Sequence, residues 1–399
     1  MSRLQRNNQA RPILPDRIVL RHLRLPLVHH FETSFGRVNR QETVIVEVHA
    51  AGLVGYGESP ASAAPFYSAE TVHTCLHVMR DFLVPMLRDA ARKAVERMPC
   101  RDDVTGRSRR LIVDPTELPG IFARVRGHNM AKAGLEAALW DLKARLEHKP
   151  LHALYGARRK RIPAGVSLGI EDSIEALLER IRLFVARGYR RIKLKIKPGW
   201  DVDVLDRVRA AFPLLPLMVD ANSAYSLKDL RHLKRLDRYR LLMIEQPLGW
   251  DDIIDHARLQ KALRTPICLD ESIHSPDDAR KAIELGACRI INIKPARVGG
   301  PTRALQVHDT CRKLGVPVWC GGLLETGIGR AHNIAIAALP GFLFPGDISG
   351  SDRYYKRDVI SPPVQVDSRG WISVPRGSGL GFQVDLRRLA EYTTEALKL

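Results

Sequence analysis

The sequence has little that would mark it as a secreted, disulfide-bonded or membrane-spanning protein. Its six cysteines are scattered and form no C-x-x-C pair, which argues against a disulfide framework and against a zinc site. No stretch approaches the roughly 20 consecutive apolar residues of a membrane-spanning helix. Residues 1–17 carry charges but no apolar core of the kind that secretory signals contain. We therefore expect a protein of the reducing cytoplasm, with no membrane partner.

Aromatic residues are also scarce, at 6% of the chain, although the net charge is +19. Basic clusters such as residues 158–161 and 231–235 could attract phosphate groups. They lie in unrelated segments, however, and no helix-turn-helix, zinc-finger or RNP-type pattern accompanies them. We expect a basic solvated surface that steers anionic small molecules, and no nucleic-acid partner in the main role.

The first part of the chain alternates in the manner of an antiparallel sheet. Residues 18–20 and 44–48 have the composition of strands, and a polar and aromatic loop is expected at 30–36 between them. The sequence Gly-Tyr-Gly-Glu at residues 55–58 suggests a tight return. Residues 68–155 then favour helices, with an exposed insertion or a mobile connection at about 91–119.

From residue 162 onward, short apolar runs alternate with helical segments. Strands are predicted at 162–170, 190–196, 217–220, 241–245, 267–270, 289–294, 316–321 and 342–347. This alternation indicates an α/β protein with a parallel sheet, and seven or eight such units can close a TIM-type barrel. An open doubly wound sheet would normally carry a Gly-rich phosphate loop after its first strand, and the sequence has none there.

Charged residues end five consecutive strands of this series. Asp220, Glu245 and Asp270 lie 25 residues apart, Lys195 lies 25 before the first of them, and Lys294 lies 24 after the last. Barrel active sites form at the carboxyl ends of the strands, where these side chains would meet. Three buried carboxylates would repel one another unless a cation held them. Oxygen-only ligation suits Mg²⁺, and Mn²⁺ accepts the same ligand types.

The lysines indicate the reaction class. Lys193 and Lys195 lie on the same side of one strand, so each disfavours protonation of the other and Lys195 could serve as a neutral base. Lys294 would face them across the barrel. A divalent cation between amines suits removal of a proton next to a carboxylate, because the cation stabilises the resulting enediolate. A Schiff-base aldolase is a weaker competitor, since it has no need of three carboxylates.

Several motifs then make a family resemblance plain. The chain resembles the enolase superfamily, in its muconate-lactonising-like branch, and within that branch the o-succinylbenzoate synthase and N-acylamino acid racemase family. The matching segments are Lys193-Leu194-Lys195, Asp220-Ala221-Asn222, Glu245-Gln246-Pro247, Asp270-Glu271-Ser272, Asn292-Ile293-Lys294-Pro295, residues 319–330 and residues 345–349.

The resemblance implies an architecture. Residues 1–158 would form an α+β capping domain and residues 159–351 the β/α barrel, while residues 352–399 would return to the cap. It also implies residue roles. Asp220, Glu245 and Asp270 would bind Mg²⁺, Lys195 would be the base, and Lys294 the opposing lysine. The groups expected to tune these residues are Lys193, Asn222 and Glu271; those expected near the substrate are Ser34, Phe35, Ser167, Arg297, Gly321 and Gly322.

Two activities share this constellation. The first is o-succinylbenzoate synthase, which dehydrates 2-succinyl-6-hydroxy-2,4-cyclohexadiene-1-carboxylate to 2-succinylbenzoate in menaquinone biosynthesis. The second is N-succinyl or N-acylamino acid racemase, which needs both lysines, and one enzyme could carry both activities. A catalytically inactive binding protein of the same fold is the alternative from another class. The sequence leaves the acyl substrate and a homo-oligomer open.

Overall fold

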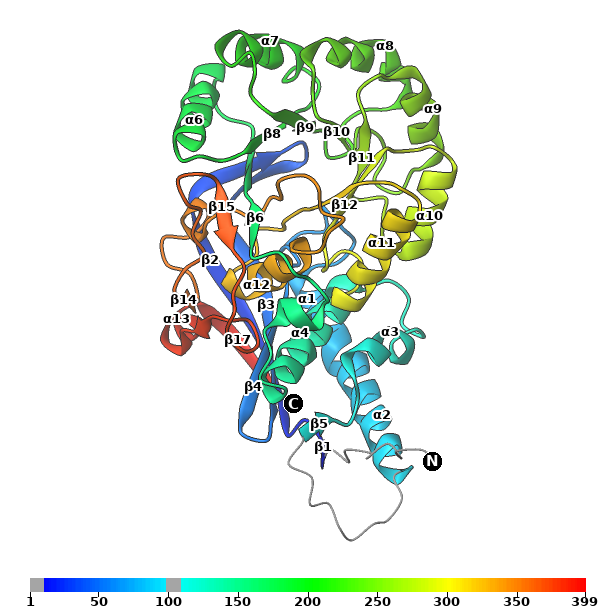
Figure 1. The fold of residues 1–399 in the computed structure, drawn as a ribbon, viewed down its shortest axis with the longest axis vertical. Helices are drawn as coiled ribbons and strands as arrows, with labels where there is room; N and C mark the ends of the chain where they lie inside the picture. The colour runs from blue at the N-terminus through cyan, green and yellow to red at the C-terminus, as the bar shows by residue number, and fades with distance from the viewer. Residues whose placement is uncertain (1–10, 98–108) are drawn as a thin grey trace, which may run out of the picture.

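The computed structural model describes residues 11–97 and 109–399, so residues 98–108 of the predicted insertion at 91–119 lie outside the described residues. Figure 1 shows two parts, a capping unit and a ring of strands and helices beside it. The capping unit is built on a four-stranded antiparallel sheet in the order β17-β2-β3-β4. Its strands are β2 (Arg17–Thr33), β3 (Gly36–Ala50), β4 (Leu53–Ser59) and β17 (Thr393–Lys398).

The C-terminal strand β17 therefore pairs with β2 near the start of the chain, with Leu397 opposite Leu20. The sheet has one face against helix α4 (Asn129–Leu146), which is buried around most of its circumference between the sheet and the barrel. Such a helix needs small and apolar side chains on nearly every side, and the run Ala-Gly-Leu-Glu-Ala-Ala-Leu-Trp at 133–140 provides them.

The remaining helices of the cap precede α4. Helix α1 (Val72–Val78) begins at Thr71, whose side chain accepts a hydrogen bond from the Thr74 amide in a capping box. It continues through a π-helical turn, η1 (Met79–Leu83), into α2 (Val84–Glu96). Short elements complete this region: β1 (Arg11–Ile13), β5 (Arg109–Leu111), η2 (Pro115–Glu117) and α3 (Leu118–Ile121).

The tight return expected at residues 55–58 is wrong, because these residues lie inside strand β4 and the chain turns at Ala51 and Gly52 instead. The two glycines serve packing rather than turning. A Cβ on Gly55 would overlap the carbonyl oxygen of Ala138, and one on Gly57 would overlap that of Gly134. Glycine lets β4 lie directly on the backbone of α4. The loop expected at 30–36 is likewise mostly strand, since β2 continues to Thr33 and β3 begins at Gly36.

The second part is a barrel-like parallel sheet of seven strands, β7 to β13, hydrogen-bonded in chain order. The strands are β7 (Gly165–Leu168), β8 (Arg191–Lys195), β9 (Leu217–Asp220), β10 (Ile244–Glu245), β11 (Ile267–Leu269), β12 (Ile290–Ile293) and β13 (Val318–Cys320). The prediction of a barrel of seven or eight β/α units is confirmed. All seven strands are buried along their length, as strands covered on both faces must be.

Helices form the outer layer (Figure 1). They are α6 (Ile174–Ala186), α7 (Val202–Ala211), α8 (Leu230–Leu233), α9 (Ile254–Ala262), α10 (Pro276–Glu284), α11 (Pro301–Lys313) and α12 (Gly327–Ala337). Short elements connect the layers: α5 (Leu151–Leu154), β6 (Arg161–Pro163), η3 (Leu227–Asp229), η4 (Lys234–Tyr239), η5 (Ser351–Arg353), β14 (Ile360–Ser361), β15 (Trp371–Ser373), β16 (Gln383–Val384) and α13 (Leu386–Tyr392).

The eighth strand, expected at 342–347, is not a continuous strand, because only isolated bridges form there. Phe342 pairs with Val318 on one side, and Gly346 pairs with Ala164 on the other. The Gly165 amide donates to the Gly346 carbonyl at 2.8 Å, and the Asp347 amide donates to the Cys320 carbonyl at 2.9 Å. Two prolines, Pro340 and Pro345, cannot donate ladder hydrogen bonds, which keeps this segment irregular. The bridges nevertheless link both edges of the sheet.

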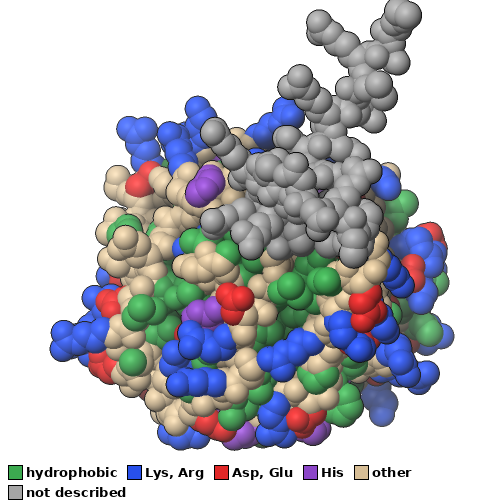
Figure 2. Space-filling view, turned by 90° about the horizontal axis from the view of Figure 1, so that it is seen from below, with side chains coloured by type: hydrophobic (Ala, Val, Ile, Leu, Met, Phe, Trp, Pro, Cys, Tyr) green, Lys and Arg blue, Asp and Glu red, His purple; other side chains and the backbone are tan. Residues whose placement is uncertain are grey.

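The basic residues are dispersed over the surface. Figure 2 shows Lys and Arg side chains spread over one face, with Asp and Glu among them. Many form exposed ion pairs, such as Arg238 with Asp206 and Arg280 with Glu284. The five cysteines among the described residues are free and buried. Among those residues, no helix is both long and apolar enough to cross a membrane.

Candidate active site

A cavity of about 590 Å³ lies between the capping unit and the carboxyl ends of the barrel strands. Phe31, Phe35 and Tyr67 line it from the cap, and Lys193, Lys195 and Lys294 line it from the barrel. Its size falls within the range of small-molecule sites. The β2–β3 hairpin reaches the barrel mouth, where the Ser34 hydroxyl donates to the Asn222 carbonyl at 2.9 Å.

Strand β8 directs two lysines into the cavity, since residues two apart on a strand share a face. The Lys193 ammonium donates to Asp220 at 2.9 Å and to Glu245 at 2.8 Å. The Lys195 ammonium donates to Asp220 at 2.7 Å and to the Asn222 side-chain oxygen at 2.5 Å. Asp220 stands beside Lys195 in the register of β8 and β9. Both lysines are almost completely buried.

Lys294 follows β12 on the other side of the cavity. Its ammonium donates to Asp270 at 2.6 Å and to the Tyr67 hydroxyl at 3.0 Å, while the same hydroxyl donates to Asp270 at 3.1 Å. The guanidinium of Arg297 is also bonded to Asp270, and it donates to the carbonyls of Ile273 and Asn292. The sequence thus places a lysine on each side of the same cavity, with carboxylates between them.

Asp220, Glu245 and Asp270 are at most 1% exposed. A set of carboxylate oxygens that can only accept hydrogen bonds fits a hard divalent cation. Two neighbouring oxygens have no hydrogen-bond partner among the described residues, Glu271 Oε2 and Asn292 Oδ1. Such buried atoms lose the free energy of solvation without compensation. The donor set and these two atoms are consistent with a cation. The three carboxylates, bonded here to lysines and to Arg297, do not bring one oxygen each within 4.8 Å of one another.

The two lysines that face each other differ electrostatically. Burial lowers the pKa of Lys195, and the attraction of Asp220 offsets this only in part. Burial also acts on Lys294, but its hydrogen bond to Tyr67 and the carboxyl groups of Glu245 and Glu271 raise its pKa above the ordinary value. For Lys193, Asp220 and two further carboxylates outweigh burial and raise the pKa well above its usual range. Lys195 is thus the lysine most easily deprotonated.

The pKa values of the carboxyl groups also shift in both directions, because burial raises them and neighbouring lysines lower them. Burial and the charge of Asp220 raise the pKa of Glu245, and burial raises the pKa of Glu271 to about 7. In Asp220, Lys193 and Lys195 overcome burial and hold the pKa below its usual range. A neighbouring cation would favour the ionised forms of Glu245 and Glu271, which burial disfavours.

The other residues singled out in the sequence separate into two groups. Ser167, Gly322, Phe35 and Asn222 line the cavity. Arg297, Gly321, Ser34 and Glu271 do not belong to its lining, although each contacts a residue of the site. A Cβ on Gly321 would lie 2.7 Å from Lys294 Cε, so glycine leaves room for that lysine. The prediction that Arg297 contacts substrate therefore has no support from its position.

Asp347, Tyr67 and Asn292 were missed among the site residues. Asp347 lines the cavity and pairs with Lys193 and Arg191, both at 2.7 Å. It ends the eighth apolar run, so the strand-end rule that found Asp220 could have found it too. Asn292 donates to Glu245 at 2.6 Å from two residues before Lys294, on the same side of β12. Tyr67 lies in an irregular loop of the cap, where no sequence period points to it.

Comparison with known proteins agrees with this geometry. Residues 17–156 match the model for "Mandelate racemase / muconate lactonizing enzyme, N-terminal domain", and residues 176–388 match "Enolase C-terminal domain-like". The chain is 52% identical to an o-succinylbenzoate synthase of Geobacillus kaustophilus over 94% of its own length and 95% of the relative's. It is 45% identical to an N-succinylamino acid racemase of Thermus thermophilus, with coverage of 92% and 94%.

A solved structure of an enolase superfamily member from Listeria innocua superposes with a TM-score of 0.87 at 40% identity, covering 97% of this chain and 99% of that one. Both domain models and the near full-length relatives lead to the same assignment. The chain belongs to the enolase superfamily, in its mandelate racemase / muconate lactonizing enzyme family.

Proposed function

We propose that the chain is a cytoplasmic, Mg²⁺-dependent o-succinylbenzoate synthase. It would dehydrate 2-succinyl-6-hydroxy-2,4-cyclohexadiene-1-carboxylate to 2-succinylbenzoate. The observation that carries the proposal is the pair Lys195 and Lys294, which line one cavity beside three buried carboxylates. The near full-length relatives named o-succinylbenzoate synthase, at 42–52% identity, support the choice of reaction.

Lys195 is the proposed base. In its neutral form, Nζ takes the proton from the ring carbon that bears the carboxylate, and burial favours that neutral form. The C–O bond to the ring hydroxyl then breaks, and the proton on Lys195 passes to the departing hydroxide, so that water is released and the ring becomes aromatic. Lys294 remains protonated, which its raised pKa favours, and its charge stabilises the negative charge that develops on the substrate.

Asp220, Glu245 and Asp270 are the proposed ligands of Mg²⁺, with Mn²⁺ as a substitute. When bound, the ion supplies Lewis-acid stabilisation of the substrate carboxylate. Lys193 holds Asp220 and Glu245 in place through hydrogen bonds, and Asn292 bonds the other carboxylate oxygen of Glu245.

The cap excludes water from the reaction. Phe31 and Phe35 lie at the tip of the β2–β3 hairpin and line the cavity, and Phe66 adds a third aromatic ring from the loop before α1. Ser167, Gly322 and Leu324 line the cavity from the barrel side. We propose that the succinyl chain of the substrate lies among these groups, with Ser167 Oγ as a donor, because this buried hydroxyl has no partner among the described residues.

Racemisation of N-succinylamino acids is the second candidate. The observation that favours it is the opposed placement of the two lysines, since a racemase must remove a proton on one face and return one on the other. Neutral Lys195 and protonated Lys294 are the states needed for one direction of that reaction. The Thermus thermophilus relative named N-succinylamino acid racemase supports this reading.

The test uses the purified protein with Mg²⁺ and two substrates in parallel. With the cyclohexadiene carboxylate we expect 2-succinylbenzoate, and chelator treatment should abolish its formation until Mg²⁺ is restored. With a succinylated amino acid in deuterated buffer, exchange of the α-proton reports proton removal alone, and inversion reports racemase activity. Absence of both product and exchange would rule out the two candidate functions together and would favour a binding protein of the same fold.

A further inference from the structure

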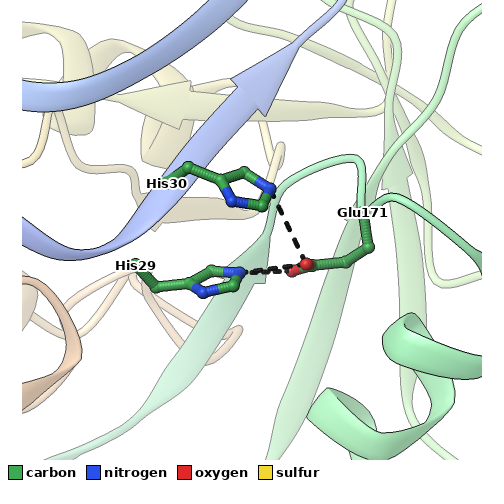
Figure 3. Close-up of side chains that lie close together, drawn as sticks. All are labelled: His29, His30 and Glu171. Atoms are coloured by element: carbon green, nitrogen blue, oxygen red, sulfur yellow. Dashed lines mark hydrogen bonds and ion pairs between the residues drawn. The ribbon is translucent and has the colours of Figure 1, made fainter.

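A second cluster of ligand-type side chains lies where the cap meets the first barrel strand. His29 and His30 belong to β2, and Glu171 lies in the loop that follows β7 (Figure 3). His29 Nε2 is 2.9 Å from Glu171 Oε2, and His30 Nε2 is 3.7 Å from the same oxygen. Within the described ranges, this is the one group of three His, Cys, Asp or Glu side chains whose ligand atoms all lie within 4.8 Å of one another.

Two consecutive residues of a regular strand point to opposite faces, yet both imidazoles point to Glu171 (Figure 3). The pairing of β2 with β3 explains this, because the register shifts between Pro26 and Phe31. Such an irregularity turns a side chain away from its regular direction. The rings of His29 and His30 stack with their centroids 4.3 Å apart and 29° between their planes.

The cluster contains a polar atom that the protein alone does not satisfy. His30 Nε2 is buried and has no hydrogen-bond partner among the described residues, although it faces the Glu171 carboxylate. The side chain of Glu171 is 4% exposed, and those of His30 and His29 are 15% and 28% exposed. The ligand atoms are therefore largely sheltered, with an approach from solvent on the His29 side.

We propose that His29, His30 and Glu171 bind a divalent transition-metal ion of the Zn²⁺ class. Two imidazoles and one carboxylate are a ligand set that such ions accept, with a fourth position left for water. Bond lengths of about 2.0–2.1 Å in a tetrahedral site place ligand atoms roughly 3.3 Å apart. The observed separations of 2.9 and 3.7 Å lie on either side of that value.

A neighbouring basic side chain bears on the ion's affinity. The guanidinium of Arg180 stands 3.7 Å from Glu171 Oε1. Its positive charge repels a cation, so we expect moderate rather than tight binding.

The site would couple the cap to the barrel. Phe31 directly follows His30, lines the cavity, and has its ring 5.9 Å from Lys195 Nζ. The Ile170 amide, next to Glu171, donates to the Glu32 carbonyl of the hairpin at 3.0 Å. An ion held by both elements would fix the end of the hairpin that covers the cavity.

The experiment compares the untagged wild type with His29→Gln/His30→Gln, both saturated with Mg²⁺ and then dialysed against Zn²⁺. Zinc that displaces Mg²⁺ in the barrel contributes equally to both proteins, so the difference reports the new site. We expect the wild type to bind one more equivalent. X-ray absorption at the zinc edge should show imidazole nitrogens in the wild type. His152→Gln, which removes a histidine on α5, is the matched control and should bind like the wild type.

A second variant guards against a folding defect. Glu171→Gln keeps an oxygen that accepts a hydrogen bond from His29 but loses the negative charge. Loss of a residue that only hydrogen-bonds to a metal ligand costs roughly tenfold or more in metal affinity, so loss of a ligand's charge should weaken zinc binding by at least that much. Hydrogen exchange of residues 28–36 should slow on zinc addition in the wild type and in His152→Gln only. Equal zinc stoichiometry in the wild type and the double variant, or zinc without imidazole ligands, would overturn the proposal.

Discussion

At the scale of single residues, the site depends on two lysines, Lys195 and Lys294, that have different electrostatic surroundings. Lys195 is buried beside one carboxylate and a second lysine, so its pKa is lowered. Lys294 is buried beside Asp270 and Tyr67, and its pKa is raised. Because the surroundings set the protonation states, the same residue type can act as a base on one side and as a fixed cation on the other.

Replacing Lys195 by Ala should therefore slow proton removal strongly. We expect a loss of at least about 10²- to 10⁴-fold in kcat for dehydration, the range that a positioned base contributes. Exchange of the α-proton of a succinylated amino acid should fall with it. Lys197→Ala is the matched control: this lysine follows the same strand, but it is 38% exposed and paired with Glu32. Activity in Lys195→Ala near that of Lys197→Ala would contradict the assignment of the base.

Tyr67 was not predicted as a site residue from the sequence, and its contacts lead to a second prediction. Its hydroxyl bonds both Lys294 and Asp270, so Tyr67→Phe removes one partner from each. We expect a loss of roughly 10- to 100-fold in kcat/KM, as for other groups that orient metal ligands, and a higher Mg²⁺ concentration for half-maximal rate. Tyr392→Phe removes a hydroxyl outside the cavity and should behave as wild type. An unchanged Mg²⁺ dependence would show that Tyr67 does not act through Asp270.

At the scale of elements, the sequence predicts the strands and helices that recur at regular spacing. It does not predict segments that lie outside such a repeat. Each β/α unit of the barrel has nearly the same length, so the strand-end residues Asp220, Glu245 and Asp270 could be found from their spacing. The loop around Tyr67 follows no period. The segment at 342–347 follows the repeat, but the repeat does not predict that it forms isolated bridges in place of a continuous strand. Nor can sequence alone separate a glycine that turns from one that packs, because the reason lies in a distant helix.

Gly57 allows that distinction to be measured. Ala has no conflict with a regular strand, but its Cβ at this position would overlap the backbone of α4 at Gly134. We expect Gly57→Ala to lower the free energy of unfolding by about 1–3 kcal/mol or more, the cost of overpacking a tight contact. Gly120→Ala is the control, since a Cβ there meets no heavy atom within 4 Å. Denaturant titration of both variants would contradict the packing role if they were equally stable.

At the scale of the whole molecule, buried carboxylates of the cap join it to the barrel at helix N-termini. Glu58 of β4 accepts from the backbone amides of Thr326 and Gly329 at the start of α12, at 3.1 and 2.9 Å. Glu136 of α4 accepts from the Thr302 amide at the start of α11, at 2.6 Å. Free amides and the helix dipole favour an acceptor there. The cavity is lined by residues of both the cap and the barrel. These contacts lie outside the cavity and help to fix the position of one part relative to the other.

Glu136, which connects the cap to the barrel, also makes the stability of the protein depend on pH. Burial raises its pKa to about 7 from an ordinary value of 4.5, with the Thr302 amide opposing. The folded state thus favours the protonated form, and the stability this gives is present below pH 4.5 and is lost as the pH rises through about 7. Glu136→Gln stays neutral and keeps a side-chain oxygen for the Thr302 amide and the Trp140 indole.

We therefore expect the free energy of unfolding of Glu136→Gln, minus that of the wild type, to grow between pH 4.5 and 7 and then to level off. A shift of this size corresponds to at most about 3 kcal/mol. Denaturant titrations at several pH values measure the difference, and other titrating groups, Glu58 among them, cancel from it. Glu175→Gln, which changes an exposed carboxylate on α6, should show no such growth. A difference independent of pH would mean that Glu136 is ionised in the folded protein throughout, held by the N-terminus of α11 more strongly than burial disfavours it.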